Sequence, residues 1–259
     1  MKKSFYLDAV LYLFITIGVI GVAPIFVFSS YLWILPVLQV VFLIPLLIKK
    51  SKLWYSALFF VLLFLFFMLT SRLNFALFAS ILAFIIYLLG ALIFKTLRKE
   101  ILWLKKGLLN KNIAMLIVGA VVISTTGLLI WAYFSRHTFS FYLTYVPEWR
   151  PGFLIIGAVA FAVVNAISEE LVFRGIFWDG LEKIWKNPVF VISVQAVFFG
   201  LCHYRGFPSG VSGIFLSFGY GMILGFIRHK SKGLLAPVIA HFFADIVIAI
   251  VLLKYFNFI

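Results

Sequence analysis

Unbroken apolar segments of about 20 residues recur along this chain, and they limit its fold more than any other feature. An α-helix rises about 1.5 Å per residue, so about 20 apolar residues cross a hydrocarbon layer of ~30 Å. The alternating segments of about 10 residues that build membrane β-barrels are absent. The chain is 65% hydrophobic and only 12% charged, whereas a soluble domain has about 25% charged residues. We therefore predict an all-α polytopic membrane protein.

Nine segments are long and apolar enough to be counted as spans. The sequence predicts a bundle of about eight or nine transmembrane helices, with eight if the short second segment is re-entrant or merges with the first. The segments are residues 4–28, 31–48, 53–71, 74–94, 113–134, 152–178, 188–204, 211–227 and 234–253.

Basic residues between the spans indicate the orientation in the membrane. Lys and Arg in alternate connections number 16 on one side and five on the other. Under the positive-inside rule the amino terminus is expected in the cytoplasm, with the protein multi-pass in the cell membrane. The net charge of +14 is explained by these short groups, so we expect the lipid bilayer as a partner and no nucleic acid.

The longest basic connection, residues 95–112, interleaves lysines with apolar residues such as Trp103. This pattern predicts an interfacial basic helix on an anionic leaflet. The connection also divides the chain. Residues 1–111 would contain the N-terminal spans and this helix, and residues 112–259 would form a catalytic transmembrane domain.

Four ionisable side chains lie inside the later spans: Glu169, Glu170, Arg174 and Asp245. Each costs about 2.5 to 3.5 kcal/mol at the centre of a membrane, so such residues normally face a bundle interior or a wet cavity. Glu170 and Arg174 are four residues apart, in the order that favours an ion pair on one helix face. That pairing leaves Glu169 without a structural explanation.

Two histidines extend this set. His203 ends one span, and His241 lies four residues before Asp245 on the same helix face. A carboxylate and an imidazole in a wet intramembrane pocket can together deprotonate water. A second histidine can stabilise an oxyanion or bind a metal. Glu169, His203, His241 and Asp245 are therefore also candidate ligands for a divalent metal such as zinc, although the compact H-E-x-x-H spacing is absent.

Three motifs in order, Glu169-Glu170-x-x-x-Arg174, Phe199-x-x-x-His203 and His241-x-x-x-Asp245, resemble the signature of the CPBP (Abi) intramembrane proteases, which include the CAAX prenyl endopeptidases. The resemblance covers residues 152–254. It implies an intramembrane active-site cavity in which Glu169 and His203 activate water, and His241 and Asp245 stabilise the oxyanion. Glu170, Arg174 and Phe199 would support them.

One position departs from this pattern. Prenyl-processing members typically have asparagine where this chain has Asp245. An ionised aspartate cannot donate a hydrogen bond, so Asp245 must be protonated, orient His241 or bind a metal.

The resemblance implies an intramembrane endopeptidase, a metalloprotease-like hydrolase acting on a peptide or membrane-protein segment. CAAX-type processing and bacteriocin or signal-peptide maturation or immunity are the substrate classes expected. On this hypothesis no cofactor is required. Two alternatives remain: a proton- or ion-coupled transporter, and a catalytically idle immunity or scaffold membrane protein. The sequence does not indicate the oligomeric state.

Overall fold

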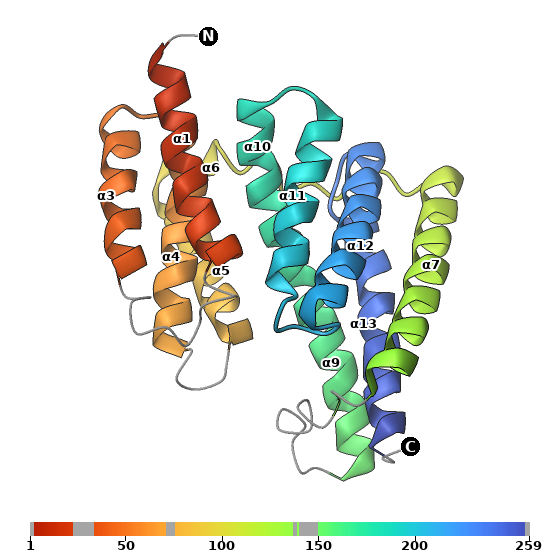
Figure 1. Ribbon diagram of the computed structural model, residues 1–259. Coiled ribbons are helices and arrows are strands. Elements are labelled where there is room, and N and C mark those ends of the chain that lie inside the picture. The colour runs from red at the N-terminus through yellow and green to blue at the C-terminus, as the bar shows by residue number, and fades with distance from the viewer. Residues whose placement is uncertain (1–2, 23–33, 71–75, 137–138, 140–149, 257–259) are drawn as a thin grey trace.

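The computed structural model describes residues 3–22, 34–70, 76–136, 139 and 150–256, and every regular element in these ranges is helical. Figure 1 shows two groups of helices along the chain, with the amino-terminal helices on one side and the carboxyl-terminal helices on the other. The all-α polytopic membrane fold predicted from the apolar segments is confirmed.

The amino-terminal group is built from short apolar helices. Its elements are α1 (Lys3–Ile17), the π-helical turn η1 (Gly18–Val22), α3 (Ile34–Ile48), α4 (Trp54–Thr70), α5 (Ala76–Ile93) and α6 (Lys95–Arg98). The outer residues of the predicted spans, 23–28, 31–33, 71 and 74–75, lie outside the described ranges.

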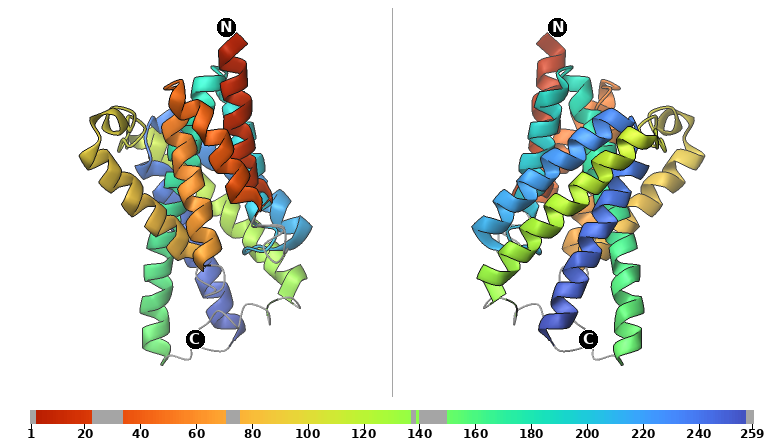
Figure 2. Two further views of the ribbon diagram at one scale, coloured as in Figure 1. Left: turned by 90° about the vertical axis from the view of Figure 1, so that its left-hand side faces the viewer. Right: turned by 90° about the vertical axis from the view of Figure 1, so that its right-hand side faces the viewer.

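The carboxyl-terminal group contains the longer helices. Its elements are α7 (Lys111–Ser135), α9 (Pro151–Glu170), the π-helical segment η4 (Leu171–Phe177), α10 (Trp178–Ile184), α11 (Pro188–Cys202), α12 (Gly210–Ser231) and α13 (Leu235–Tyr255). Helices α7, α12 and α13 lie side by side, as the right-hand view of Figure 2 shows. Helix α9 packs on α13, and α11 packs on α12.

Within the described residues, four helical stretches are long and apolar enough to cross a membrane: residues 111–135, 152–184, 210–231 and 235–255. Five shorter apolar helices accompany them. Each of the nine predicted spans coincides with one of these stretches. Two helical stretches extend beyond the predicted spans: the stretch that contains span 152–178 continues through η4 and α10 to Ile184, and α12 continues past residue 227 to Ser231.

A single buried apolar cluster joins the two groups of helices. It includes Tyr12 of α1 and Phe60 of α4 together with Phe177 of η4 and Leu181 of α10. Polar contacts reinforce this junction. The Tyr12 hydroxyl lies 3.0 Å from Ser56 Oγ, and Ser56 Oγ donates to the carbonyl of Ile176 at 3.1 Å. The amino-terminal helices therefore hold the segment that follows the two glutamates.

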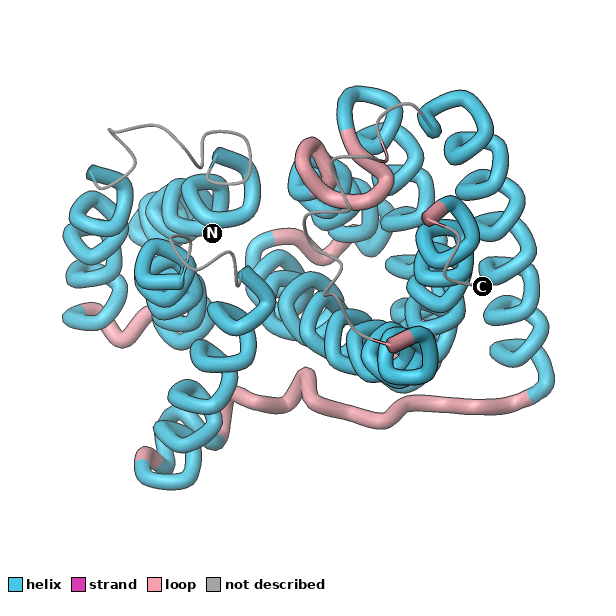
Figure 3. Tube along the Cα trace, turned by 90° about the horizontal axis from the view of Figure 1, so that it is seen from below, coloured by secondary structure: helices cyan, strands magenta, loops and turns pink. Residues whose placement is uncertain are grey.

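The basic connection is not the helix that its sequence predicts. Only Lys95–Arg98 is helical, and residues 99–110 form a strap that Figure 3 shows as a long loop along one side of the bundle. The strap's backbone pairs with the α12–α13 turn: Leu108 N donates to Ser231 O at 2.8 Å, and Leu234 N donates to Lys105 O at 2.8 Å. Trp103, expected at the membrane surface, is 3% exposed. The connection thus pairs its backbone with the α12–α13 turn and buries Trp103, where the sequence predicts a helix on the membrane surface.

Replacing Gly107 by alanine is expected to destabilise the protein by about 1–3 kcal/mol. Gly107 has a φ of +81°, and an added Cβ would lie 2.5 Å from the Gly233 Cα. The measurement is the apparent unfolding temperature in detergent. Gly119→Ala is the matched control, because nothing lies within 4 Å of its new Cβ and alanine is the better helix former by ~1 kcal/mol. Equal unfolding temperatures for the two variants would contradict the close contact.

Candidate active site

The side chains of the two adjacent glutamates at the end of α9 lie in different environments. Helix α9 begins with proline at its first position, where the missing N–H costs nothing, and it continues directly into η4 after Glu170. Glu170 is completely buried, whereas the Glu169 side chain is 29% exposed. Glu169 lines a cavity between the helices. Neighbouring positions on one helix point in directions about 100° apart, which places the two carboxylates in separate environments.

Glu170 bridges a cation and an imidazole. Its Oε1 accepts from Arg174 Nη1 and from His241 Nδ1, each at 2.8 Å. Arg174 is also completely buried, and its guanidinium lies 4.3 Å from the centre of the Phe199 ring. The i, i+4 pair expected from the sequence is thus present, and it is linked to α13 through His241.

The π-helical segment places Arg174 and exposes backbone groups that other helices satisfy. A π-helical turn alters the i→i−4 hydrogen-bond pattern and is frequent at functional sites. Arg228 Nε of α12 donates to the Arg174 carbonyl at 3.0 Å. Trp103 of the strap packs so closely on Gly175 that a Cβ there would lie 2.7 Å from the indole ring. Side chains from α4, α12 and the strap therefore surround η4.

His203 has one nitrogen occupied and one available. Helix α11 is capped by Asn187, whose side chain accepts from Val189 N at 2.9 Å, and it ends at Cys202, with His203 as the C-cap residue. His203 Nδ1 lies 2.8 Å from the carbonyl of Phe199. A carbonyl can only accept, so Nδ1 carries the hydrogen. In the neutral ring, Nε2 is then the acceptor.

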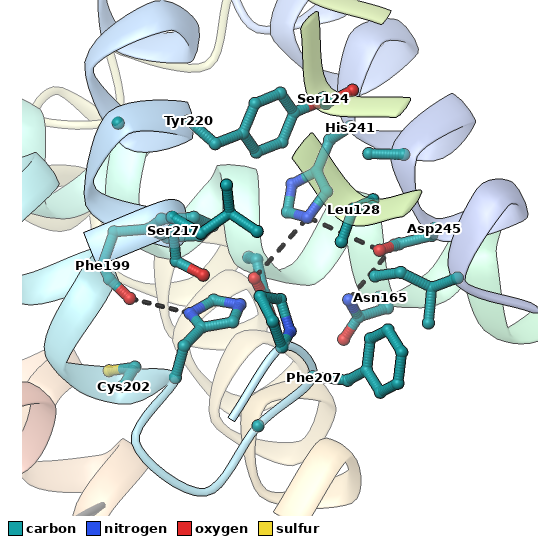
Figure 4. Close-up of a pocket in the computed structure, with 18 of the residues that line it drawn as sticks. Ser124, Leu128, Asn165, Phe199, Cys202, Phe207, Ser217, Tyr220, His241 and Asp245 are labelled. Carbon is teal, nitrogen blue, oxygen red and sulfur yellow. Dashed lines mark hydrogen bonds and ion pairs between the residues drawn. The ribbon is translucent and has the colours of Figure 1, made fainter. Parts of the chain in front are cut away.

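His241 stands among three carboxylates. Its Nε2 lies 3.7 Å from Glu169 Oε2 and 3.7 Å from Asp245 Oδ1, and its Nδ1 contacts Glu170. Asp245 accepts through Oδ2 from Asn165 Nδ2 at 3.2 Å. Figure 4 shows His241, Asp245 and Asn165 connected in this order. The structure therefore connects α9 to α13 through the catalytic candidates.

The four candidate catalytic residues share one cavity of about 450 Å³. Glu169, His203, His241 and Asp245 all line it, together with Phe199. Glu170 and Arg174 lie behind this wall. Most other lining side chains are apolar: Ile123, Leu128, Phe161, Phe207, Pro208, Phe215, Leu216, Ile223, Ala244 and Ile248. A polar end with two carboxylates and two histidines thus opens into an apolar chamber.

Glu169 has an oxygen that makes no hydrogen bond to the described residues, although His241 Nε2 lies 3.7 Å from it. Its Oε2 is buried, and no donor of the described residues lies within hydrogen-bonding distance. Among these residues, no group of three or more histidine, cysteine or acidic side chains is arranged to hold a metal ion. The candidate zinc ligands therefore share a cavity without forming a compact ligand set.

Several residues of the site were missed in the sequence. Asn165 lies one turn before Glu169, and Gln195 donates to the Gly221 carbonyl at 2.8 Å, which Arg174 Nη2 also contacts at 3.4 Å. Arg228 lies one residue beyond the predicted span 211–227 and is part of α12 in the structure. The sequence contained one signal for Asn165 and Gln195: each places an amide side chain inside an apolar span. Burying an amide costs free energy unless it makes a hydrogen bond, so each indicates a polar partner.

Comparison with protein families matches residues 151–247 to the family described as type II CAAX prenyl endopeptidase Rce1-like. The matched range runs from the first residue of α9 into α13 and contains all the site residues named from the sequence. No curated protein and no solved structure matches the chain.

Proposed function

We propose that Glu169 and His203 activate water for peptide hydrolysis, since residues 151–247 match the Rce1-like family of type II CAAX prenyl endopeptidases, a protease family. The observation that carries the proposal is the partly exposed Glu169 carboxylate side chain in the wall of the cavity that His203 also lines. With its Nδ1 bound to the Phe199 carbonyl, His203 presents Nε2 as a second acceptor. Two acceptors at one end of a cavity are suited to hold and deprotonate a water molecule.

The proposed reaction begins when the water oxygen attacks the carbonyl carbon of the scissile bond. One water proton passes to the Glu169–His203 pair, and the carbonyl oxygen becomes an oxyanion. His241 stabilises this charge in its doubly protonated form, with its Nε2–H directed to the oxyanion, while its Nδ1–H donates to Glu170, which Arg174 holds in turn. Collapse of the intermediate breaks the C–N bond, and the proton held by the pair passes to the leaving nitrogen.

Asp245 acts as an acceptor in this proposal. Its two oxygens face His241 Nε2 and the Asn165 amide. These contacts support a role in orienting His241, in preference to donating a hydrogen bond or binding a metal. No metal is required for these steps, and none of them passes through one.

The substrate class follows from the chamber beside the polar residues. Aromatic and aliphatic side chains from α7, α9, α12 and α13 line it, which supports an apolar peptide or membrane-protein segment, as in CAAX-type processing or signal-peptide and bacteriocin maturation. We also propose that the amino terminus is cytoplasmic and that the protein resides in the cell membrane, in keeping with its basic connections.

The test is cleavage of a peptide library by the purified protein in liposomes, read by mass spectrometry. We expect endoproteolytic products that persist after treatment with a chelator. Loss of cleavage on chelation, with recovery on adding zinc, would contradict the metal-free mechanism. Ion or proton flux without cleavage would support a transporter, and a cellular effect that survives Glu169→Ala would support an idle scaffold.

A further inference from the structure

The proposed hydrolysis creates an oxyanion in the cavity, and besides His241 few cavity side chains can donate a hydrogen bond to it. Glu169 and Asp245 are acceptors when ionised. Ser124 Oγ donates to the carbonyl of Val121, on its own helix, at 3.1 Å. His203 has its N–H on the Phe199 carbonyl. These side chains therefore leave the Asn165 amide as a prominent donor.

Asn165 lies on the same face of α9 as Glu169. The two residues are four apart, so their side chains project to the same side of the helix, one turn from each other. Both line the cavity. One helix face thus brings the proposed base and an amide to the same space.

The Asn165 amide is held in one orientation. Its nitrogen donates to Asp245 Oδ2 at 3.2 Å, and within the described residues this is its one hydrogen bond. A carboxylate only accepts, so the NH₂ end of the amide must face Asp245. An amide nitrogen has two N–H groups, and the second remains for a ligand of the cavity.

We propose that Asn165 donates this second N–H to the oxyanion of the tetrahedral intermediate, and that Asp245 is the residue that positions the amide. This inference rests on the proposed peptidase function. The hydrogen-bond donor to the oxyanion is then Asn165 on α9, because Asp245 on α13 cannot donate while it is ionised. Figure 4 shows Tyr220 directed towards Ser124, and Ser217 apart from Asn165. The hydroxyls of Tyr220 and Ser217 also line the cavity and are the rival donors.

The experiment compares Asn165→Ala with the wild type on a peptide that the wild type cleaves. Loss of an oxyanion donor costs about 10²–10³ in kcat, so we expect kcat to fall by this amount with KM within threefold. Affinity for a phosphinate peptide analogue of the tetrahedral intermediate should fall in parallel with kcat/KM. A purely structural role would instead lower the unfolding temperature. Thr126→Val is the matched control, since Thr126 is exposed and its hydroxyl donates to its own helix.

The exchange variant Asn165→Asp/Asp245→Asn tests the same point without truncating a side chain. It keeps one amide and one carboxylate in contact and should regain at least tenfold in kcat over Asn165→Asp alone. The inference would be overturned if Asn165→Ala left kcat unchanged or changed KM alone. It would also be overturned if Ser217→Ala or Tyr220→Phe lowered kcat by the expected amount while Asn165→Ala did not. An active wild type in these cases leaves the proposed peptidase function standing, whereas an inactive wild type overturns both.

Discussion

Replacing Glu169 by glutamine is expected to lower kcat/KM at least about 10³-fold, within the range for loss of a general base. Glutamine keeps the size of the side chain and removes the carboxylate that takes the proton from water. The Glu169 side chain is partly exposed, and its Oε2 accepts no hydrogen bond from the described residues, with His241 Nε2 3.7 Å away. The unfolding temperature should therefore change little. The measurement is initial cleavage rate in liposomes against peptide concentration.

Two other glutamates provide controls for this prediction. Glu182→Gln changes an exposed carboxylate of α10 and should leave cleavage unaltered. Glu170→Gln should lower the unfolding temperature, because Glu170 is buried between Arg174 and His241. The assignment of the two adjacent glutamates is reversed if Glu169→Gln retains activity while Glu170→Gln loses it at full stability.

Replacing Arg174 by leucine is expected to destabilise the protein by about 3–5 kcal/mol, the usual cost of removing one partner of a buried ion pair. Both side chains of the pair are completely buried, so the Glu170 carboxylate would lose its cation without gaining water. The guanidinium also lies over Phe199, and that contact would be lost as well. The measurement is the apparent unfolding temperature in detergent, with the fraction of folded protein in membranes as a second readout.

The double variant Glu170→Gln/Arg174→Leu separates charge from packing. It removes both charges, and we expect it to be more stable than Arg174→Leu alone, because a neutral amide is less costly to bury than an unpaired carboxylate. Glu100→Gln is the matched control. It breaks the pair with Lys183, in which the Glu100 side chain is 37% exposed, and should cost at most about 1 kcal/mol. Similar losses of stability in Glu100→Gln and Arg174→Leu would contradict the large stabilising effect expected of the buried Arg174 pair.

Much of the fold follows from the sequence, because segment length and hydropathy are properties of single helices. The Glu170–Arg174 pair likewise depends on spacing within one helical stretch. The contact between Glu170 and His241 could not be predicted in this way, since it depends on the register between α9 and α13. The π-helical geometry of η4 has no sequence pattern by which it could be predicted. The residues that contact η4, namely Ser56, Arg228 and Trp103, come from distant parts of the chain.

The strap was the largest error, and its cause is physical. Lysines alternating with apolar residues are typical of a surface helix, but that pattern takes no account of backbone partners elsewhere. Here the turn at 231–235 offers amides and carbonyls to residues 105–108, and the contact between Gly107 and Gly233 allows the two backbones to meet. Asn165 was missed for a related reason, because its partner Asp245 lies 80 residues further along the chain.

The pairing between the strap and the α12–α13 turn has a practical consequence for work on this protein. A charged connection between two groups of helices would ordinarily be chosen for an epitope tag, a reporter fusion or an engineered cleavage site. In this chain, an inserted residue between 105 and 108 would shift the backbone partners of the turn immediately before α13, the helix that bears His241 and Asp245. Such insertions should impair the proposed peptidase activity from outside the cavity, and labels are better placed elsewhere.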